Sequence, residues 1–124
     1  MKKLLLSIIL GMMSLCVNAI TWNSNYMQVC VDGGDFGDYI KSKTIITFTE
    51  PSHDKKGVYT FNTEGAIFKV YLSNIYKDGT VETYDSEGNM FWISFINMPN
   101  YGVVAILVKC VSDNKTFLYD LIKK

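Results

Sequence analysis

Short runs of hydrophobic residues, separated by turn-forming residues at near-regular intervals, recur along the chain after residue 19. The runs are rich in Val, Ile, Phe, Tyr and Thr, and none has the apolar spacing of an amphipathic helix. This pattern is typical of an all-β domain. It predicts about eight strands, at residues 21–31, 43–49, 57–62, 66–73, 79–84, 89–97, 102–111 and 115–122.

The residues between the runs predict tight reversals of the chain. Asp78-Gly79 separates two runs, and we expect a type I′ hairpin turn there because Asp-Gly tolerates the positive φ angles that this turn needs. Turn-forming residues also occupy 85–89, 98–102 and 112–115. Successive short reversals favour a single antiparallel meander, in which each strand pairs with the next.

Alternation within single runs predicts how the strands are covered. Val104, Ile106, Val108 and Cys110 share one face of their strand, and the opposite face is also largely apolar. Strands of this kind lie centrally, with a covering layer on each face. The sequence therefore predicts a small barrel, lipocalin- or calycin-like, or a two-layer β-sandwich, with a slight preference for the barrel.

The first nineteen residues have the pattern of a secretory signal peptide. A positive start, Lys2-Lys3, is followed by an apolar run and by a cleavage site whose last residue is Ala19. The apolar run is too short to span a bilayer comfortably, so we predict cleavage after Ala19 rather than a retained anchor. The leader looks bacterial. Residues 20–124 are then expected to form a single exported domain, periplasmic or secreted, without stable membrane insertion.

Charge and composition narrow the function classes. The 124 residues include 12 cationic and 12 acidic residues, and every cationic residue is a lysine. A chain without a basic excess is a poor nucleic-acid binder. A chain without arginine lacks the bidentate clamp that phosphate and carboxylate substrates often meet. We therefore expect one domain without a nucleic-acid partner, and no cofactor is expected.

Cys30 and Cys110, the two cysteines that remain after leader cleavage, predict a disulfide. Small exported domains commonly carry such bridges. A bridge that closes a loop of roughly eighty residues would stabilise the fold by about 4 kcal/mol in the chain-entropy model. The alternative is two separate buried thiols that behave as small hydrophobes, and the spacing alone leaves both open.

Two loops carry residue types that occur in metal and catalytic sites. Asp32, Asp35 and Asp38 lie among glycines and are a calcium candidate, because calcium takes several oxygen ligands. Their spacing departs from that of an EF-hand loop, so a solvated turn is the favoured alternative. His53, the single histidine, lies between a serine and an aspartate. Catalytic triads are assembled from separated positions, so we interpret this loop as a polar connection and assign no catalytic residue.

Four short motifs follow one another through about two thirds of the 20–124 domain. They are Ile-Ile-Thr-Phe at 45–48, Val-Tyr-Thr-Phe at 58–61, Asp-Ser-Glu-Gly-Asn at 85–89 and Phe-Leu-Tyr-Asp-Leu at 117–121. In this order they resemble small exported proteins of Bacteroidetes that carry a signal peptide and a compact β domain of unknown function. Those proteins often have a Cys-Val-Asp-Glu-Asp-Gly-like segment where this chain has residues 83–88 and no cysteine. The resemblance implies no activity and no site residue.

Aromatic residues are the remaining candidates for function. Tyrosine and tryptophan are favoured at protein interfaces and on sugar-binding surfaces, and Tyr76 and Tyr101 lie beside expected turns. The first hypothesis is a non-catalytic exported module that binds a protein or a glycan at the cell envelope or outside the cell. The second is a barrel that carries a small apolar ligand. The third is an uncharacterised hydrolase, which needs acidic side chains to converge on His53.

Overall fold

The computed structural model describes residues 19–50 and 57–124, and within these ranges it contains eight β-strands and no helix that could span a membrane. The strands are β1 (Ala19–Val31), β2 (Ile40–Thr49), β3 (Val58–Thr63), β4 (Ala66–Ile75), β5 (Val81–Tyr84), β6 (Met90–Met98), β7 (Gly102–Cys110) and β8 (Lys115–Asp120). Each predicted strand corresponds to one of these, so the all-β prediction is confirmed. The predicted leader up to residue 18 and His53 both lie outside the described residues.

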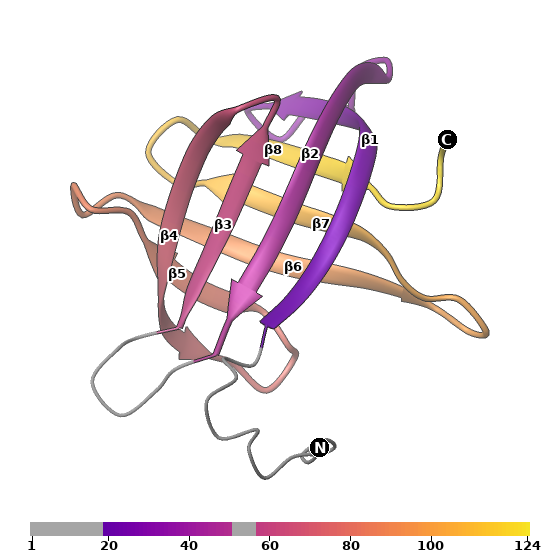
Figure 1. Ribbon diagram of the computed structural model, residues 1–124. Coiled ribbons are helices and arrows are strands. Elements are labelled where there is room, and N and C mark those ends of the chain that lie inside the picture. The colour runs from indigo at the N-terminus through magenta and orange to yellow at the C-terminus, as the bar shows by residue number, and fades with distance from the viewer. Residues whose placement is uncertain (1–18, 51–56) are drawn as a thin grey trace, which may run out of the picture.

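Each strand pairs antiparallel with the next one in sequence, and β8 returns to pair with β1. This last ladder, from Tyr26–Asp120 to Val31–Lys115, closes the sheet into a barrel. Figure 1 shows β1 to β4 crossing steeply in front of β6, β7 and β8. Closure pairs the first and last strands, which would otherwise be exposed edges. The predicted meander is therefore a barrel, and the sandwich alternative is wrong.

The turn at Asp78-Gly79 differs from the prediction. Only Gly79 has a positive φ angle there, 92°, and its N–H donates to the carbonyl oxygen of Tyr76 over 2.9 Å. This is a type I turn followed by a left-handed glycine, not a type I′ turn. The two-residue connection with two positive φ angles is instead Glu64 (51°) and Gly65 (98°), between β3 and β4.

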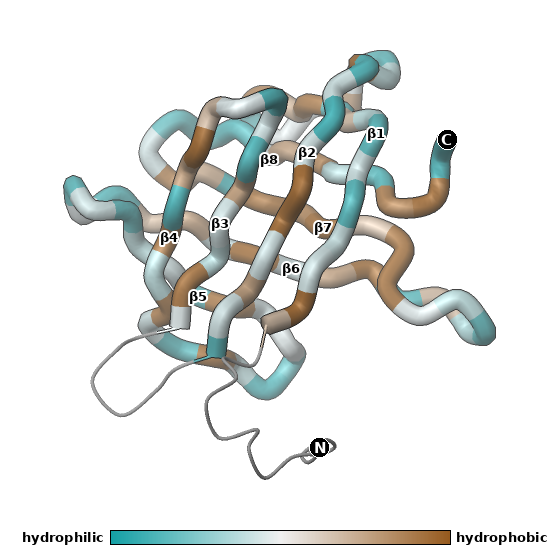
Figure 2. Tube along the Cα trace, in the orientation of Figure 1, coloured by the Kyte–Doolittle hydropathy of each residue, from teal (hydrophilic) through white to brown (hydrophobic). Residues whose placement is uncertain are grey.

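Large apolar side chains fill the middle of the barrel and one of its ends. Ile46, Ile93 and Ile106 have no exposed surface and belong to one core cluster. Trp22 packs on Phe95 toward the end where β2 finishes, with ring centroids 5.7 Å apart. Burying a side chain of this size stabilises the fold by about 1.5–3 kcal/mol. In Figure 2, hydrophobic and hydrophilic positions alternate along much of β4, as expected for a strand with one face inside the barrel.

Candidate functional site

A cavity of about 340 Å³ opens at the opposite end of the barrel, where β3 turns into β4 and β7 turns into β8. Its walls come from β3, β4, β6, β7, β8 and the connection that follows β7. Small-molecule sites typically occupy roughly 300 to 1,000 Å³. The barrel is therefore filled by side chains over part of its length and hollow at its mouth.

Aromatic rings make most of the inner wall of this cavity. Phe61 and Phe68 are register partners across β3 and β4, so both point to the same side of the sheet. Phe68 meets Phe91 edge-on at a centroid distance of 5.1 Å, and Phe61 meets Tyr119 at 5.5 Å. Phe117, the register partner of Val108, completes the opposite wall. Tilted and edge-on contacts of this kind are the favoured ring geometries, so the wall is a preformed apolar surface.

The mouth remains hollow because the residues there are small or polar. Thr63 and Ala66 are register partners at the ends of β3 and β4, and both line the cavity. Behind them, the hydroxyl of the fully buried Thr44 lies 2.9 Å from that of Thr63. The two hydroxyls satisfy one another, which removes the cost of an unpaired buried polar group. A larger apolar residue at these positions would fill the space.

Few polar groups reach the cavity. Asp113 contributes a carboxylate from the connection between β7 and β8, and Tyr119 contributes a phenol. Burial raises the pKa of Tyr119, so its phenol is neutral at ordinary pH and can donate or accept a hydrogen bond. This arrangement suits the binding of an apolar molecule that has one polar end.

Cys110 lies in the cavity wall, but Cys30 does not, and the expected disulfide between them is not formed: both are free, buried thiols. Val29 is the register partner of Phe117, which points inward, so the next residue, Cys30, faces outward. There its thiol donates a hydrogen bond of 2.8 Å to the carbonyl oxygen of Gly34. The two cysteines also belong to β1 and β7, which flank β8, so about two strand spacings separate them, roughly 10 Å. A disulfide requires Cα atoms within about 7 Å.

The side chains of Asp32, Asp35 and Asp38 do not converge on a common position where an ion could bind. Gly34 and Gly37 donate backbone hydrogen bonds to Val31 and Val29, which holds the loop against the end of β1. Among residues 19–50 and 57–124, no three acidic, cysteine or histidine side chains gather closely enough to hold a metal ion. The calcium candidate is therefore not supported, and the solvated-turn alternative fits the loop.

Tyr76 and Tyr101, the two predicted recognition residues, lie in different environments. Tyr101 is 71 % exposed at the turn between β6 and β7. Tyr76 lies against the ring of Trp92 on the outside of the barrel, at a centroid distance of 5.5 Å, and its hydroxyl donates to Glu82 over 2.5 Å. This hydrogen bond lowers the pKa of Glu82 and raises that of Tyr76. Tyr76 thus belongs to a cluster with Trp92 and Glu82 on the outside of the barrel, and Tyr101 lies outside this cluster.

Sequence reasoning did not identify the residues of the cavity. It did recognise that Val108 and Cys110 share an apolar face, and it offered a barrel that carries a small apolar ligand as its second hypothesis. Comparison with models of known protein families, with curated proteins and with solved structures gave no match. The resemblance to exported Bacteroidetes β-domain proteins therefore stays a prediction, as does export itself.

Proposed function

We propose that this protein binds a small apolar molecule at the open end of its barrel, without catalysing a reaction on it. The observation that supports this proposal is the cavity of about 340 Å³ with its wall of phenylalanine rings. Its volume suits a ligand of about two aromatic rings, because an apolar cavity of about 150 Å³ already holds benzene. Since the rings pack on one another, the site needs little rearrangement to accept a ligand.

A matched pair of variants on β7 tests this proposal. Val108 lines the cavity and Leu107, its neighbour, faces outward, so Val108→Trp fills the site while Leu107→Trp adds the same ring outside. Calorimetric titration with naphthylmethanol should detect binding to the unmodified protein and to Leu107→Trp, with at least about tenfold weaker binding to Val108→Trp. Absence of binding to the unmodified protein, or equal binding to both variants, would refute the proposal.

Cys110 provides a second measurement that needs no variant. Its thiol lies in the cavity wall, whereas the thiol of Cys30 faces outward under the loop that follows β1. Bound naphthylmethanol should therefore slow alkylation of Cys110 and leave the rate at Cys30 unchanged. Equal protection of both thiols would indicate a general effect on opening of the fold, and would count against a ligand in the cavity.

A second candidate function, binding of a neutral glycan, rests on the outer cluster of Tyr76, Trp92 and Glu82. Aromatic faces stack on the apolar faces of sugar rings, and a carboxylate accepts hydrogen bonds from sugar hydroxyls. Calorimetric titration should detect binding of a neutral oligosaccharide, and Trp92→Ala should abolish this binding while Tyr101→Ala retains it. An oligosaccharide panel without any response would remove this candidate.

A further inference from the structure

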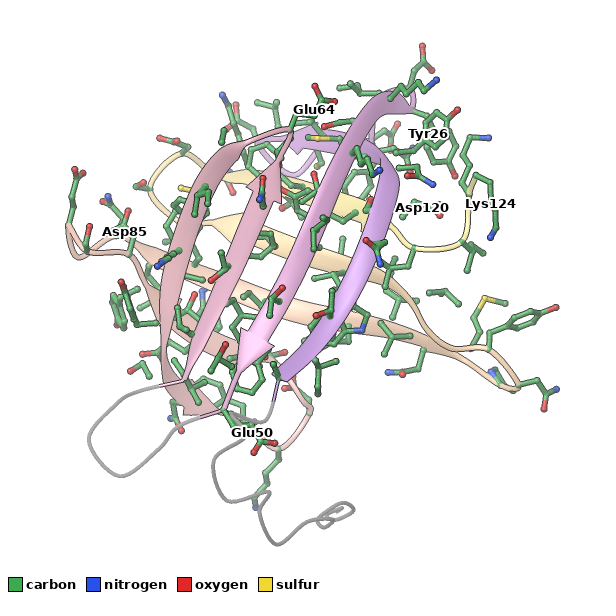
Figure 3. All side chains as sticks on the ribbon, in the orientation of Figure 1. Tyr26, Glu50, Glu64, Asp85, Asp120 and Lys124 are labelled. Atoms are coloured by element: carbon green, nitrogen blue, oxygen red, sulfur yellow. The ribbon has the colours of Figure 1, made fainter. Side chains whose placement is uncertain are left out.

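The connections around the cavity are strongly acidic. Because the strands alternate in direction, the β1–β2, β3–β4, β5–β6 and β7–β8 connections all lie at the end of the barrel where the cavity opens. In Figure 3, Glu64 accordingly lies at the far end of the barrel from Glu50. These four connections carry seven of the chain's 12 acidic residues and no lysine: Asp32, Asp35, Asp38, Glu64, Asp85, Glu87 and Asp113.

This charge is local, because the chain as a whole has a formal net charge of zero. Lys41, Lys43, Lys69 and Lys115 lie on the strands next to these connections and offset part of it, but the acids outnumber them. A concave site surrounded by charges of one sign raises the local concentration of ligands of the opposite sign. The mouth should therefore attract cations and repel anions.

A second hollow, of about 440 Å³, adjoins the cavity and shares Ile67 and Phe68 with it. Its other walls include the carboxylates of Asp85 and Glu87, together with Lys69. A molecule that leaves the aromatic cavity across Phe68 thus enters a polar hollow lined by two acidic residues and one lysine. Asp113 provides a third carboxylate in the cavity wall itself.

Asp85 is held in its ionised form. The side-chain amide of Asn89 donates to its Oδ2 over 3.0 Å, and the backbone N–H groups of Asn89 and Glu87 donate to its Oδ1. These hydrogen bonds lower the pKa of Asp85, so the carboxylate keeps its charge through mildly acidic pH. The β5–β6 turn therefore presents a fixed negative charge beside the cavity.

We infer that the ligand of the cavity is a cationic amphiphile: an apolar body of about two rings, or a short chain, with an ammonium or guanidinium head. This inference rests on the proposed function and adds the chemical class of the ligand. The body fills the space between Phe61, Phe91 and Phe117, and the head lies at the mouth, near Asp113 and the hollow that Asp85 and Glu87 line. The same carboxylates would repel the carboxylate head of a fatty acid of the same size.

Three probes with the same naphthyl body and different head charges test the inference on the full chain. They are naphthylmethylammonium, naphthylmethanol and naphthylacetate, and their dissociation constants are measured by calorimetric titration. At low ionic strength the cation should bind about tenfold more tightly than the anion, with the neutral alcohol between them. Added salt should reduce this ratio toward about threefold, because the mouth is exposed to solvent and its charges are screened.

Asp113→Asn removes the carboxylate nearest the cavity, and Asp78→Asn, in the β4–β5 turn at the other end of the barrel, changes the net charge equally. The first variant should weaken binding of the cation about threefold and weaken binding of the alcohol less, while the second should alter neither. If Asp113→Asn fails to fold, the salt dependence of the unmodified protein still decides the question.

The outcomes separate the two proposals. Equal affinities for the three probes at low salt, or tightest binding of the anion, would overturn the inference and leave the apolar-ligand function standing. Failure of all three probes to bind would overturn the proposed function, and the inference with it. Affinities that decrease from the cation to the alcohol to the anion, with differences that become smaller in Asp113→Asn and in added salt, would support the proposed function and the inference.

Discussion

Replacing Thr63 by valine should destabilise the fold more than replacing Thr44, although Thr44 is the more buried residue. Thr44 has no exposed surface, whereas Thr63 is half-buried and lines the cavity. Among the residues that the structure describes, Thr63 is the one hydrogen-bond partner that the Thr44 hydroxyl has, over 2.9 Å. Valine has nearly the size and branching of threonine, so each change removes little more than one hydroxyl group.

The difference in free energy of unfolding follows from what each variant leaves behind. Thr63→Val leaves the Thr44 hydroxyl buried without a partner, and such a group costs about 1–3 kcal/mol. Thr44→Val leaves the Thr63 hydroxyl facing a cavity that can hold water, so we expect a cost of about 1 kcal/mol or less. In the double variant no orphaned hydroxyl remains, and adding Thr44→Val to Thr63→Val should restore about 1–2 kcal/mol.

Urea unfolding followed by tryptophan fluorescence measures these values, since Trp22 packs on the core through Phe95. The four proteins should have equal dependence of stability on urea, so that midpoints alone report the differences. For a domain of this size, each kcal/mol corresponds to a melting-temperature shift of about 4–8 °C. A Thr44→Val variant less stable than Thr63→Val, or a double variant whose loss equals the sum of the single losses, would refute the reasoning.

Three further predictions concern the core and the thiols. Ile93→Ala should lower the free energy of unfolding by about 2–5 kcal/mol, because the Ile93 side chain is fully buried in the packed part of the barrel. Ile75 is 60 % exposed, so Ile75→Ala should change stability by about 0.5 kcal/mol or less in the same urea assay. Similar losses in the two variants would contradict the packing described. Burial raises the pKa of Tyr59 from 10.0 to about 12, so the folded state favours the neutral phenol. The contribution of Tyr59 to the free energy of unfolding should therefore be complete below about pH 10 and be lost as pH rises toward 12. Tyr59→Phe should make urea midpoints less sensitive to pH in that range, and an unchanged pH dependence would argue against a role for Tyr59. Alkylation in denaturant without reductant, followed by peptide mass spectrometry, should modify both Cys30 and Cys110, whereas a bridged pair would escape modification.

The strands were predictable because their signals are local. Alternation and β-branched content act within a few residues, and each connection between strands contains at least one Gly, Asp or Asn. The exact turn type was less accessible. Asp78-Gly79 and Glu64-Gly65 look alike in sequence, but the strands on either side of Gly79 are joined by five residues from Tyr76 to Thr80, and only Glu64-Gly65 forms a two-residue connection.

The cavity and the cysteines depend on contacts between residues far apart in the chain. Phe61, Phe91 and Phe117 come from three strands, and nothing within any one strand indicates that their rings border a common space. The position of Cys30 outside the wall depends on the register of β1 with β8, which places Val29 opposite Phe117. Spacing along the sequence carries no such information, so the predicted disulfide was reasonable and still wrong.

Sequence alone determined the all-β class, the number of strands and the sequential antiparallel order. These properties follow from side-chain alternation and turn chemistry, which operate over a few neighbouring residues. Only the tertiary structure decided that β8 closes on β1, that part of the interior is hollow, that Cys30 and Cys110 face opposite sides of the wall, and that the connections with seven acidic residues lie at the end where the cavity opens. Each of these depends on register and closure, which arise when all eight strands are paired at once.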